Sequence, residues 1–316
     1  GVAASISVDG NMIISGISTL GSTSFTTDAT VNGVTVGKGA NSVSTNTVLG
    51  SSGLDASVTG GNNTAIGYDA LTTNTTGQAN SAVGSRSLED TTTGSHNTAV
   101  GYQAMQLNTT ASNNTAVGSG SLYDNTTGTR NTAVGAFAVE NNLSNDNTGV
   151  GYFALNANTT GSQNVAVGSQ ALDANTTASY GTAIGYGALG ANTTGANNTA
   201  VGHGTLAANT TGSENVAIGR IALAANEGGT NNIALGYGSL DANTTASYNI
   251  ALGRDALTNN TTGSPNIAIG YDALGDNTTA GNNTAIGHNC LALNTTGSKN
   301  VSVGNYSLDA NTTGYY

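Results

Sequence analysis

The 316-residue chain has no tryptophan, three phenylalanines, one proline and one cysteine. Large aromatic side chains supply much of the buried area of an ordinary core, so a wide globular core is excluded. The single cysteine, Cys290, excludes an internal disulfide framework and a cysteine-based zinc cluster. Stability must therefore come from backbone hydrogen bonds and from close packing of small residues.

Positive charge is also scarce, since the net charge is −11. Binding to phosphate needs clustered cations, and here they are scattered, so we expect no nucleic-acid partner. No apolar run approaches the roughly 18 residues of a spanning helix, so we expect no membrane insertion. The six basic residues are Lys38, Arg86, Arg130, Arg220, Arg254 and Lys299.

What the chain has instead is a repeat, of which "NNTAIGYDALTTNTTG" at positions 62–77 is one copy. Each copy carries one glycine, here called the anchor, after a short aliphatic stretch. Fourteen of the fifteen spacings between anchors are 17 residues, and one is 16. So strict a period predicts a solenoid, in which each turn covers only its neighbours. The sixteen anchors are Gly50, Gly67, Gly84, Gly101, Gly118, Gly135, Gly151, Gly168, Gly185, Gly202, Gly219, Gly236, Gly253, Gly270, Gly287 and Gly304.

Two aliphatic columns of the repeat are predicted to form the core. Val, Ile or Leu precedes the anchor in all sixteen copies, and Leu follows it by four residues in fourteen. We interpret them as one branched side chain from each of two short strands per turn. Ala stands two residues before the anchor in thirteen copies. This small column is predicted to pack against an identical chain in a homotrimer.

Two asparagine columns bracket the strand. Asn stands four residues before the anchor in fifteen copies and seven residues after it in fourteen. Stacked amides can hydrogen-bond along the axis and cap the corners, so we predict a structural ladder there. The recurring "NTT" also matches the N-glycosylation sequon, but as the corner of a repeat it is a weak signal. Predicted ladder members are Asn74, Asn108, Asn158, Asn175 and Asn192.

The pattern predicts an all-β fold, a parallel β-solenoid of about sixteen 17-residue turns. At a strand spacing of about 4.8 Å, the rod would be about 72 Å long. Residues 41–316 form this predicted solenoid. Residues 1–40 alternate apolar and polar positions around glycines, which predicts a β-rich shaft or a cap over the first turn.

The sequence resembles a known family of fibre repeats. "NTAVG" followed by "ALxxNTTG" is similar to the head repeats of trimeric autotransporter adhesins. It looks still more like the "NTAVGYxAL" repeats of bacteriophage tail fibres, those of cyanophages especially, and residues 26–47 look like the lead-in before such repeats. The resemblance covers roughly residues 41–316. It implies a homotrimer with left-handed coils, exposed on a virion or a cell surface.

No catalytic, metal or cofactor site is predicted. His203 and His288 follow an anchor, His96 lies in a corner, and none has a second ligand at metal spacing. Cys290 takes the place of a small core residue. The acids are spread singly, whereas a glycosidase needs a carboxylate pair in a cleft. We therefore expect that the chain is not an enzyme and needs no cofactor.

Function is expected in the columns that vary. Exposed aromatic or apolar residues there could bind a host glycan or protein receptor, repeated along the fibre. The alternative is that solvent-facing positions simply drift. Tyr also alternates with Ser just after the anchor, for which we predict a structural role. The candidate binding positions are Phe137 and Phe153, which flank the shortened repeat, with Ile221, Tyr180, Tyr248 and Tyr306.

Three function classes remain open. The first is a viral tail-fibre shaft or receptor-binding segment that mediates host attachment. The second is a cellular surface adhesin or an extracellular filament subunit. The third is an ice-binding solenoid, suggested by the paired threonines in the corners. A flat ice-binding face needs outward threonines within a strand, and the corner pair does not offer that.

Overall fold

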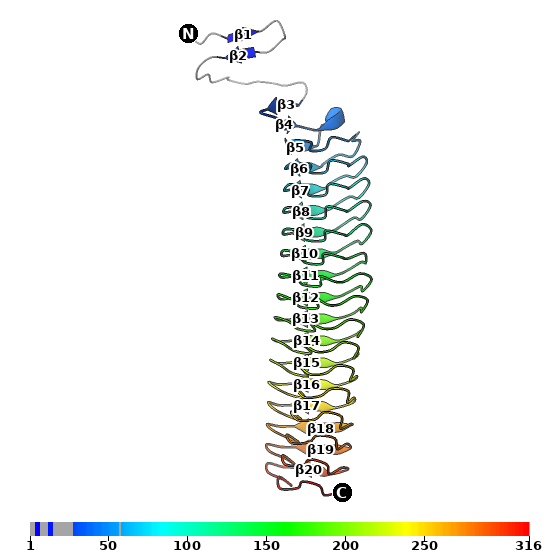
Figure 1. Cartoon of the computed structure of the whole chain (residues 1–316), viewed down its shortest axis with the longest axis vertical. Helices are drawn as coiled ribbons and strands as arrows, with labels where there is room; N and C mark the ends of the chain where they lie inside the picture. The colour runs from blue at the N-terminus through cyan, green and yellow to red at the C-terminus, as the bar shows by residue number, and fades with distance from the viewer. Residues whose placement is uncertain (1–3, 7–11, 15–27, 57, 316) are drawn as a thin grey trace.

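The computed structural model describes residues 4–6, 12–14, 28–56 and 58–315. Its main body is a straight rod of stacked turns, each contributing one short strand to a parallel sheet (Figure 1). The predicted all-β parallel solenoid with a 17-residue repeat is therefore confirmed. Within the described residues, no helix is long and apolar enough to span a bilayer.

Each strand begins three residues before an anchor glycine, or four in two turns, and pairs in register with the strands above and below. Thr182, Ala183 and Ile184, for example, face Thr199, Ala200 and Val201. The strands are β5 (Thr47–Gly50), β6 (Thr64–Ile66), β7 (Ser81–Val83), β8 (Thr98–Val100), β9 (Thr115–Val117), β10 (Thr132–Val134), β11 (Thr148–Val150), β12 (Val165–Val167), β13 (Thr182–Ile184), β14 (Thr199–Val201), β15 (Val216–Ile218), β16 (Ile233–Leu235), β17 (Ile250–Leu252), β18 (Asn266–Ile269), β19 (Asn283–Ile286) and β20 (Val301–Val303).

The core differs from the one predicted. The aliphatic residue before the anchor points outward: Val100, Ile184 and Ile218 are 38%, 41% and 43% exposed. The alanine before it, such as Ala183, is fully buried. Side chains alternate along a strand, so outward Thr and Val force the Ala between them inward. The alanine column therefore lines the inside of the coil, and it is not a contact face for another chain.

The second strand predicted in each turn is also wrong. The segment after the anchor consists of turns, and its leucine, such as Leu206, has φ of 51°. This left-handed conformation aims the leucine into the coil, where it is fully buried. Neighbouring turns still pair through their backbones there, as when Leu206 N donates to Ala222 O at 3.1 Å. Each turn thus closes a thin interior of alanine and leucine.

Both asparagine columns lie inside the coil. Asn192 Nδ2 donates to Asn175 Oδ1 at 3.1 Å, and Asn175 Nδ2 donates to Asn158 Oδ1 at 2.8 Å. The same amides also bond the corner carbonyls, as Asn192 Nδ2 does to Gly195 O at 3.1 Å. Asn74 and the other predicted ladder members are all at most 1% exposed. Their amides satisfy corner backbone groups that water cannot reach.

The edge of the first turn is covered by a hairpin. Strands β3 (Ala29–Val31) and β4 (Val34–Gly37) pair antiparallel, and β4 pairs antiparallel with β5. A short 3-10 turn, η1 (Ala40–Ser42), follows, and Ala40 N donates to Leu54 O at 2.9 Å. A covered edge cannot recruit further strands. In the remainder of the segment predicted as shaft or cap, only β1 (Ala4–Ile6) and β2 (Met12–Ile14), an antiparallel pair, fall within the described residues.

Candidate functional site

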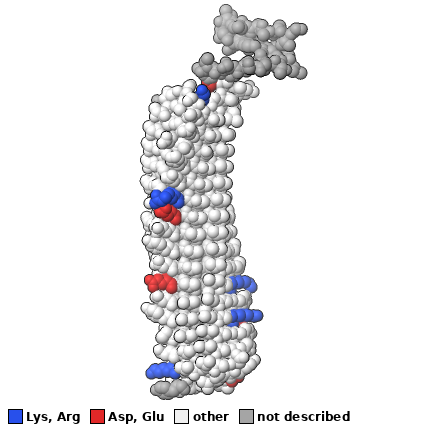
Figure 2. All heavy atoms as spheres, turned by 180° about the vertical axis from the view of Figure 1, so that it is seen from behind, with Lys and Arg blue, Asp and Glu red and all other residues white. Residues whose placement is uncertain are grey.

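The outer side of the strands is a continuous uncharged strip, here called the strand face. It consists of the residues three and one before each anchor, and no Asp, Glu, Lys or Arg occurs in either column. Figure 2 shows one side of the rod on which few charged side chains are visible. In β15 to β18 the strip is aliphatic in both columns, with Ile233 and Leu235 in the middle of that stretch. Large apolar strips of this kind mark interaction surfaces.

The opposite side, here called the turn face, is acidic. Twelve of the seventeen acids stand two, five or six residues after an anchor. Several are partly buried, and loss of solvation raises the pKa of Asp173 and Asp241 above the usual range of a carboxyl. The twelve are Asp55, Asp69, Glu89, Asp90, Asp124, Glu140, Asp173, Asp241, Asp255, Asp272, Asp276 and Asp309.

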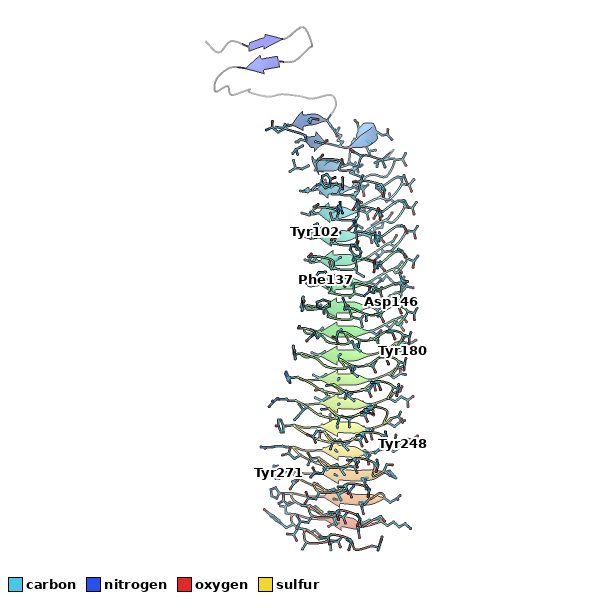
Figure 3. All side chains as sticks on the ribbon, viewed as in Figure 1. Tyr102, Phe137, Asp146, Tyr180, Tyr248 and Tyr271 are labelled. Atoms are coloured by element: carbon cyan, nitrogen blue, oxygen red, sulfur yellow. The ribbon has the colours of Figure 1, made fainter. Side chains whose placement is uncertain are left out.

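The candidate binding residues do not form one site. Tyr180 and Tyr248 lie on one edge of the rod, whereas Phe137 lies on the other edge (Figure 3). Tyr180 and Tyr248 are 58% and 65% exposed, and they stand four turns apart in the same corner column. Phe153, Ile221 and Tyr306 belong to the column of Phe137. The structure thus separates the candidates into two columns.

The aromatic cluster at the shortened turn is packed against the rod. Phe137 and Phe153 stack with ring centroids 5.3 Å apart, and Tyr152 meets Phe153 edge-on at 4.3 Å. The Phe137 ring also covers Gly120, where an added Cβ would lie 2.8 Å from it. Both phenylalanines are only partly exposed. Their ring faces are largely used within the chain, which leaves little surface for a ligand.

The column just after the anchor changes character along the rod. From β6 to β12, tyrosines such as Tyr102 alternate with small residues and are about half exposed, 53% for Tyr102. A ring that lies along the surface is about half exposed, so the structural role predicted for these tyrosines stays a prediction. From Tyr186 onward, seven successive turns carry a planar side chain: Tyr186, His203, Arg220, Tyr237, Arg254, Tyr271 and His288.

These seven residues, here called the stacked edge, contact their neighbours along the axis in two runs, Tyr186 with His203 and Arg220 through His288. Tyr271 and His288 stack at 5.1 Å and 16°, and Tyr186 and His203 stack at 5.4 Å and 17°. The Arg254 guanidinium lies 5.4 Å from the centre of the Tyr237 ring. Stacking covers part of the ring faces, while Tyr186, Tyr237 and Tyr271 stay 55%, 40% and 44% exposed, so the stacked edge offers solvent ring surface as well as N–H and O–H groups. Composition alone would not show that these side chains are in contact.

Sites for metal or modification find little support in the described ranges. No group of three His, Cys, Asp or Glu residues there could hold a metal ion. Cys290 is buried, and its thiol contacts Ser302 O at 3.3 Å. Asn158 and Asn294, which begin two of the "NTT" sequons, are fully buried, so a folded turn keeps them from a glycosylating enzyme.

Comparison with known proteins gives no match. No protein-family model matches the chain. The searches of curated proteins and of solved structures likewise find no significant similarity.

Proposed function

We propose that the chain is a segment of a structural fibre that assembles from identical copies through the strand face. The observation that carries the proposal is the strip of outward Val, Ile, Leu and Thr, uncharged in all sixteen turns. Burying it against other copies removes apolar area from water and leaves the acidic turn faces outside. Each turn adds the same contact, so a weak contact per turn sums along the rod.

We propose three copies around a common axis, because the repeat resembles those of trimeric fibre proteins. Each copy would present its strand face to the axis and its turn face to solvent, under closed symmetry. Among fibre proteins, a viral tail-fibre shaft or receptor-binding segment that attaches the virion to a host cell fits the repeat pattern best. A cellular adhesin or filament subunit is the alternative, and the sequences flanking this segment in its gene distinguish the two.

The mass in solution tests the assembly. Light scattering during gel filtration should give three times the 30.9 kDa of one chain. Val201→Lys combined with Leu235→Lys places two charges on the strand face and should yield a folded monomer, because buried unpaired charges are costly. Asn197→Lys with Asn231→Lys puts the same charges in corners of neighbouring turns and should leave the trimer intact. A wild-type monomer at high concentration contradicts the proposal.

One observation favours a second candidate, ice binding. From β8 to β11 every strand places Thr and an aliphatic residue outward, the arrangement that the corner threonines could not provide. Thr115 and Val117 are one such pair, repeated at about the 4.8 Å spacing of the strands. A monomer with thermal hysteresis, lost on Thr115→Lys, would favour this candidate over the fibre, because both use the same face.

A further inference from the structure

A hollow of about 230 Å³ opens on the turn face near the C-terminal end of the described rod. It spans the three turns that follow β18, β19 and β20. Asp272, Asn289 and Asp309 bring polar groups to it, and Leu293 and Tyr306 bring apolar surface. The volume lies below the roughly 300–1,000 Å³ of most ligand pockets and suits one monosaccharide-sized group.

The polar part of the hollow offers hydrogen-bond acceptors. The carboxylates of Asp272 and Asp309 line it, whereas Asn289 Oδ1 is shielded from solvent and so cannot meet a ligand in the hollow. Asp272 is partly desolvated, and burial together with Asp276 and Asp255 raises its pKa. A carboxylate that is partly removed from water gains from a ligand that donates O–H groups.

The apolar part offers a free ring. Tyr306 is 57% exposed and meets His288 at a centroid distance of 5.1 Å and an angle of 61°. This tilted contact, unlike the parallel stacks above it, leaves much of the ring face open. Leu293 is 49% exposed beside it. A ligand with hydroxyls on one edge and C–H groups on one face would match both parts.

We propose that this hollow binds one residue of a neutral oligosaccharide, with its hydroxyls on Asp272 and Asp309 and its C–H face on Tyr306. Neutral sugars combine the two required surfaces. The carboxylates of Asp272 and Asp309 repel sialic acid, uronic acids and sulphated sugars, so these are excluded. The proposal names the ligand class for the attachment function proposed above, on which its biological role rests.

The stacked edge extends the site along the rod. Tyr271 adjoins Asp272 in sequence, lies on an edge of the rod (Figure 3) and stacks on His288, and Arg254 lies 5.8 Å from the Tyr271 ring centre. Their outward O–H and N–H groups recur once per turn, about every 4.8 Å. Further sugar residues beyond the hollow can accept hydrogen bonds from them, so longer oligosaccharides should bind more tightly.

The test is binding of the purified chain to a panel of neutral oligosaccharides of glucose, galactose, mannose and N-acetylglucosamine, beside sialylated and sulphated ones. We expect saturable binding of at least one neutral member, measured by calorimetry, and none of the acidic ones. Asp272→Asn and Tyr306→Ala should each weaken it about tenfold or more. Asp272→Asn keeps the shape of the residue and should keep the fold, which the melting temperature checks.

The matched controls stand, like Asp272 and Tyr306, two residues after an anchor, but in distant turns. Asp69→Asn and Ile221→Ala should leave binding unchanged. Arg254→Gln should remove the gain from longer oligosaccharides and leave the binding of short ones. The inference is overturned if no neutral member binds, if acidic members bind as well, or if Asp69→Asn weakens binding as much as Asp272→Asn. The solution mass is measured separately, so loss of glycan binding with an intact trimer defeats only this inference.

Discussion

The strand face and the turn face of the rod orient their small and large side chains in opposite ways. On the strand face the small residue, Ala, points inward and the large aliphatic one points outward, as with Ala200 and Val201. On the turn face the large residue, such as Leu206, points inward and acids point outward. One leucine per turn fills the interior, so the strand opposite has room only for alanine. Apolar character therefore does not identify the buried side of these strands.

The largest expected effect comes from enlarging the inward column. Ala166, Ala183 and Ala200 changed together to Leu should prevent the coil from closing, because each added side chain costs about 1–3 kcal/mol in a filled interior. Circular dichroism and gel filtration should show an unfolded or aggregated chain.

The matched variant changes the outward neighbours, Val167, Ile184 and Val201, to Leu. These side chains point away from the interior of the coil, so the turns should still form, as circular dichroism checks, even where the contact between copies weakens. Equal damage from the two triple variants would contradict the assignment of the alanine column to the interior.

A smaller effect is expected from the ladder that joins the two faces. Asn209 donates to Asn192 Oδ1 at 2.7 Å and to Gly212 O at 2.9 Å, and it accepts from Asn226 Nδ2 at 2.8 Å. Asn209→Ala leaves Asn192 Oδ1 without its donor, at about 1–3 kcal/mol, whereas Gly212 O keeps Asn198 Nδ2 and Asn226 Nδ2 keeps Gly229 O. Chemical denaturation should show the loss, and Asn259→Ala, at an exposed position, should change stability by less than about 0.5 kcal/mol.

A gain is expected at the corner between the faces. Tyr180 has φ of 63°, a left-handed conformation that asparagine adopts more readily than tyrosine. Tyr180→Asn should raise the free energy of unfolding by up to about 1 kcal/mol. Tyr102→Asn, at an equally exposed position without positive φ, is the control and should bring no gain. A stability curve unmoved by Tyr180→Asn would show that the corner is not strained.

The smallest effect is a response to pH that comes from partly buried acids of the turn face. Burial raises the pKa of Asp173 and Asp241 above their values in the unfolded chain. The folded state then binds protons more readily, so the melting temperature should rise as the pH falls from neutral toward about 4. Asp173→Asn with Asp241→Asn should reduce this rise, and Glu89, Asp124 and Asp272, whose pKa values burial also raises, should retain the remainder. A fall in melting temperature over that window would contradict the burial of these carboxyls.

The 17-residue repeat predicts the turns, their number and the register of the strands. When every turn has the same length, residues at equivalent repeat positions face each other in neighbouring strands. The same pattern also determines which strand residues point inward, and there the prediction of an inward Val and an outward Ala is wrong. Asn198 and Ala200 are two residues apart and so share a side of the strand. Once the asparagine ladder is placed inside, alanine must lie inside and Val201 outside. The ranking of Val above Ala by hydrophobicity concealed this alternation.

Other features could not be predicted from the pattern. The left-handed backbone at Leu206 depends on how seventeen residues close a turn, and leucine has no preference for that conformation. The hollow beside Tyr306 depends on side-chain orientations over three turns. The stacked edge is different, since the run of planar residues from Tyr186 to His288 is visible once the turns are aligned.

The axial direction of the hydrogen bonds determines how the rod would respond to tension. Backbone bonds between turns lie in series along the axis, so every turn carries the same load. A turn that opens releases 17 residues, roughly 55–60 Å of extended chain, in place of a rise of about 4.8 Å. An opened turn is thus about twelve times as long as a closed one, while the other turns of the rod stay closed. A virus or cell tethered through such a fibre would be held by an extensible spring.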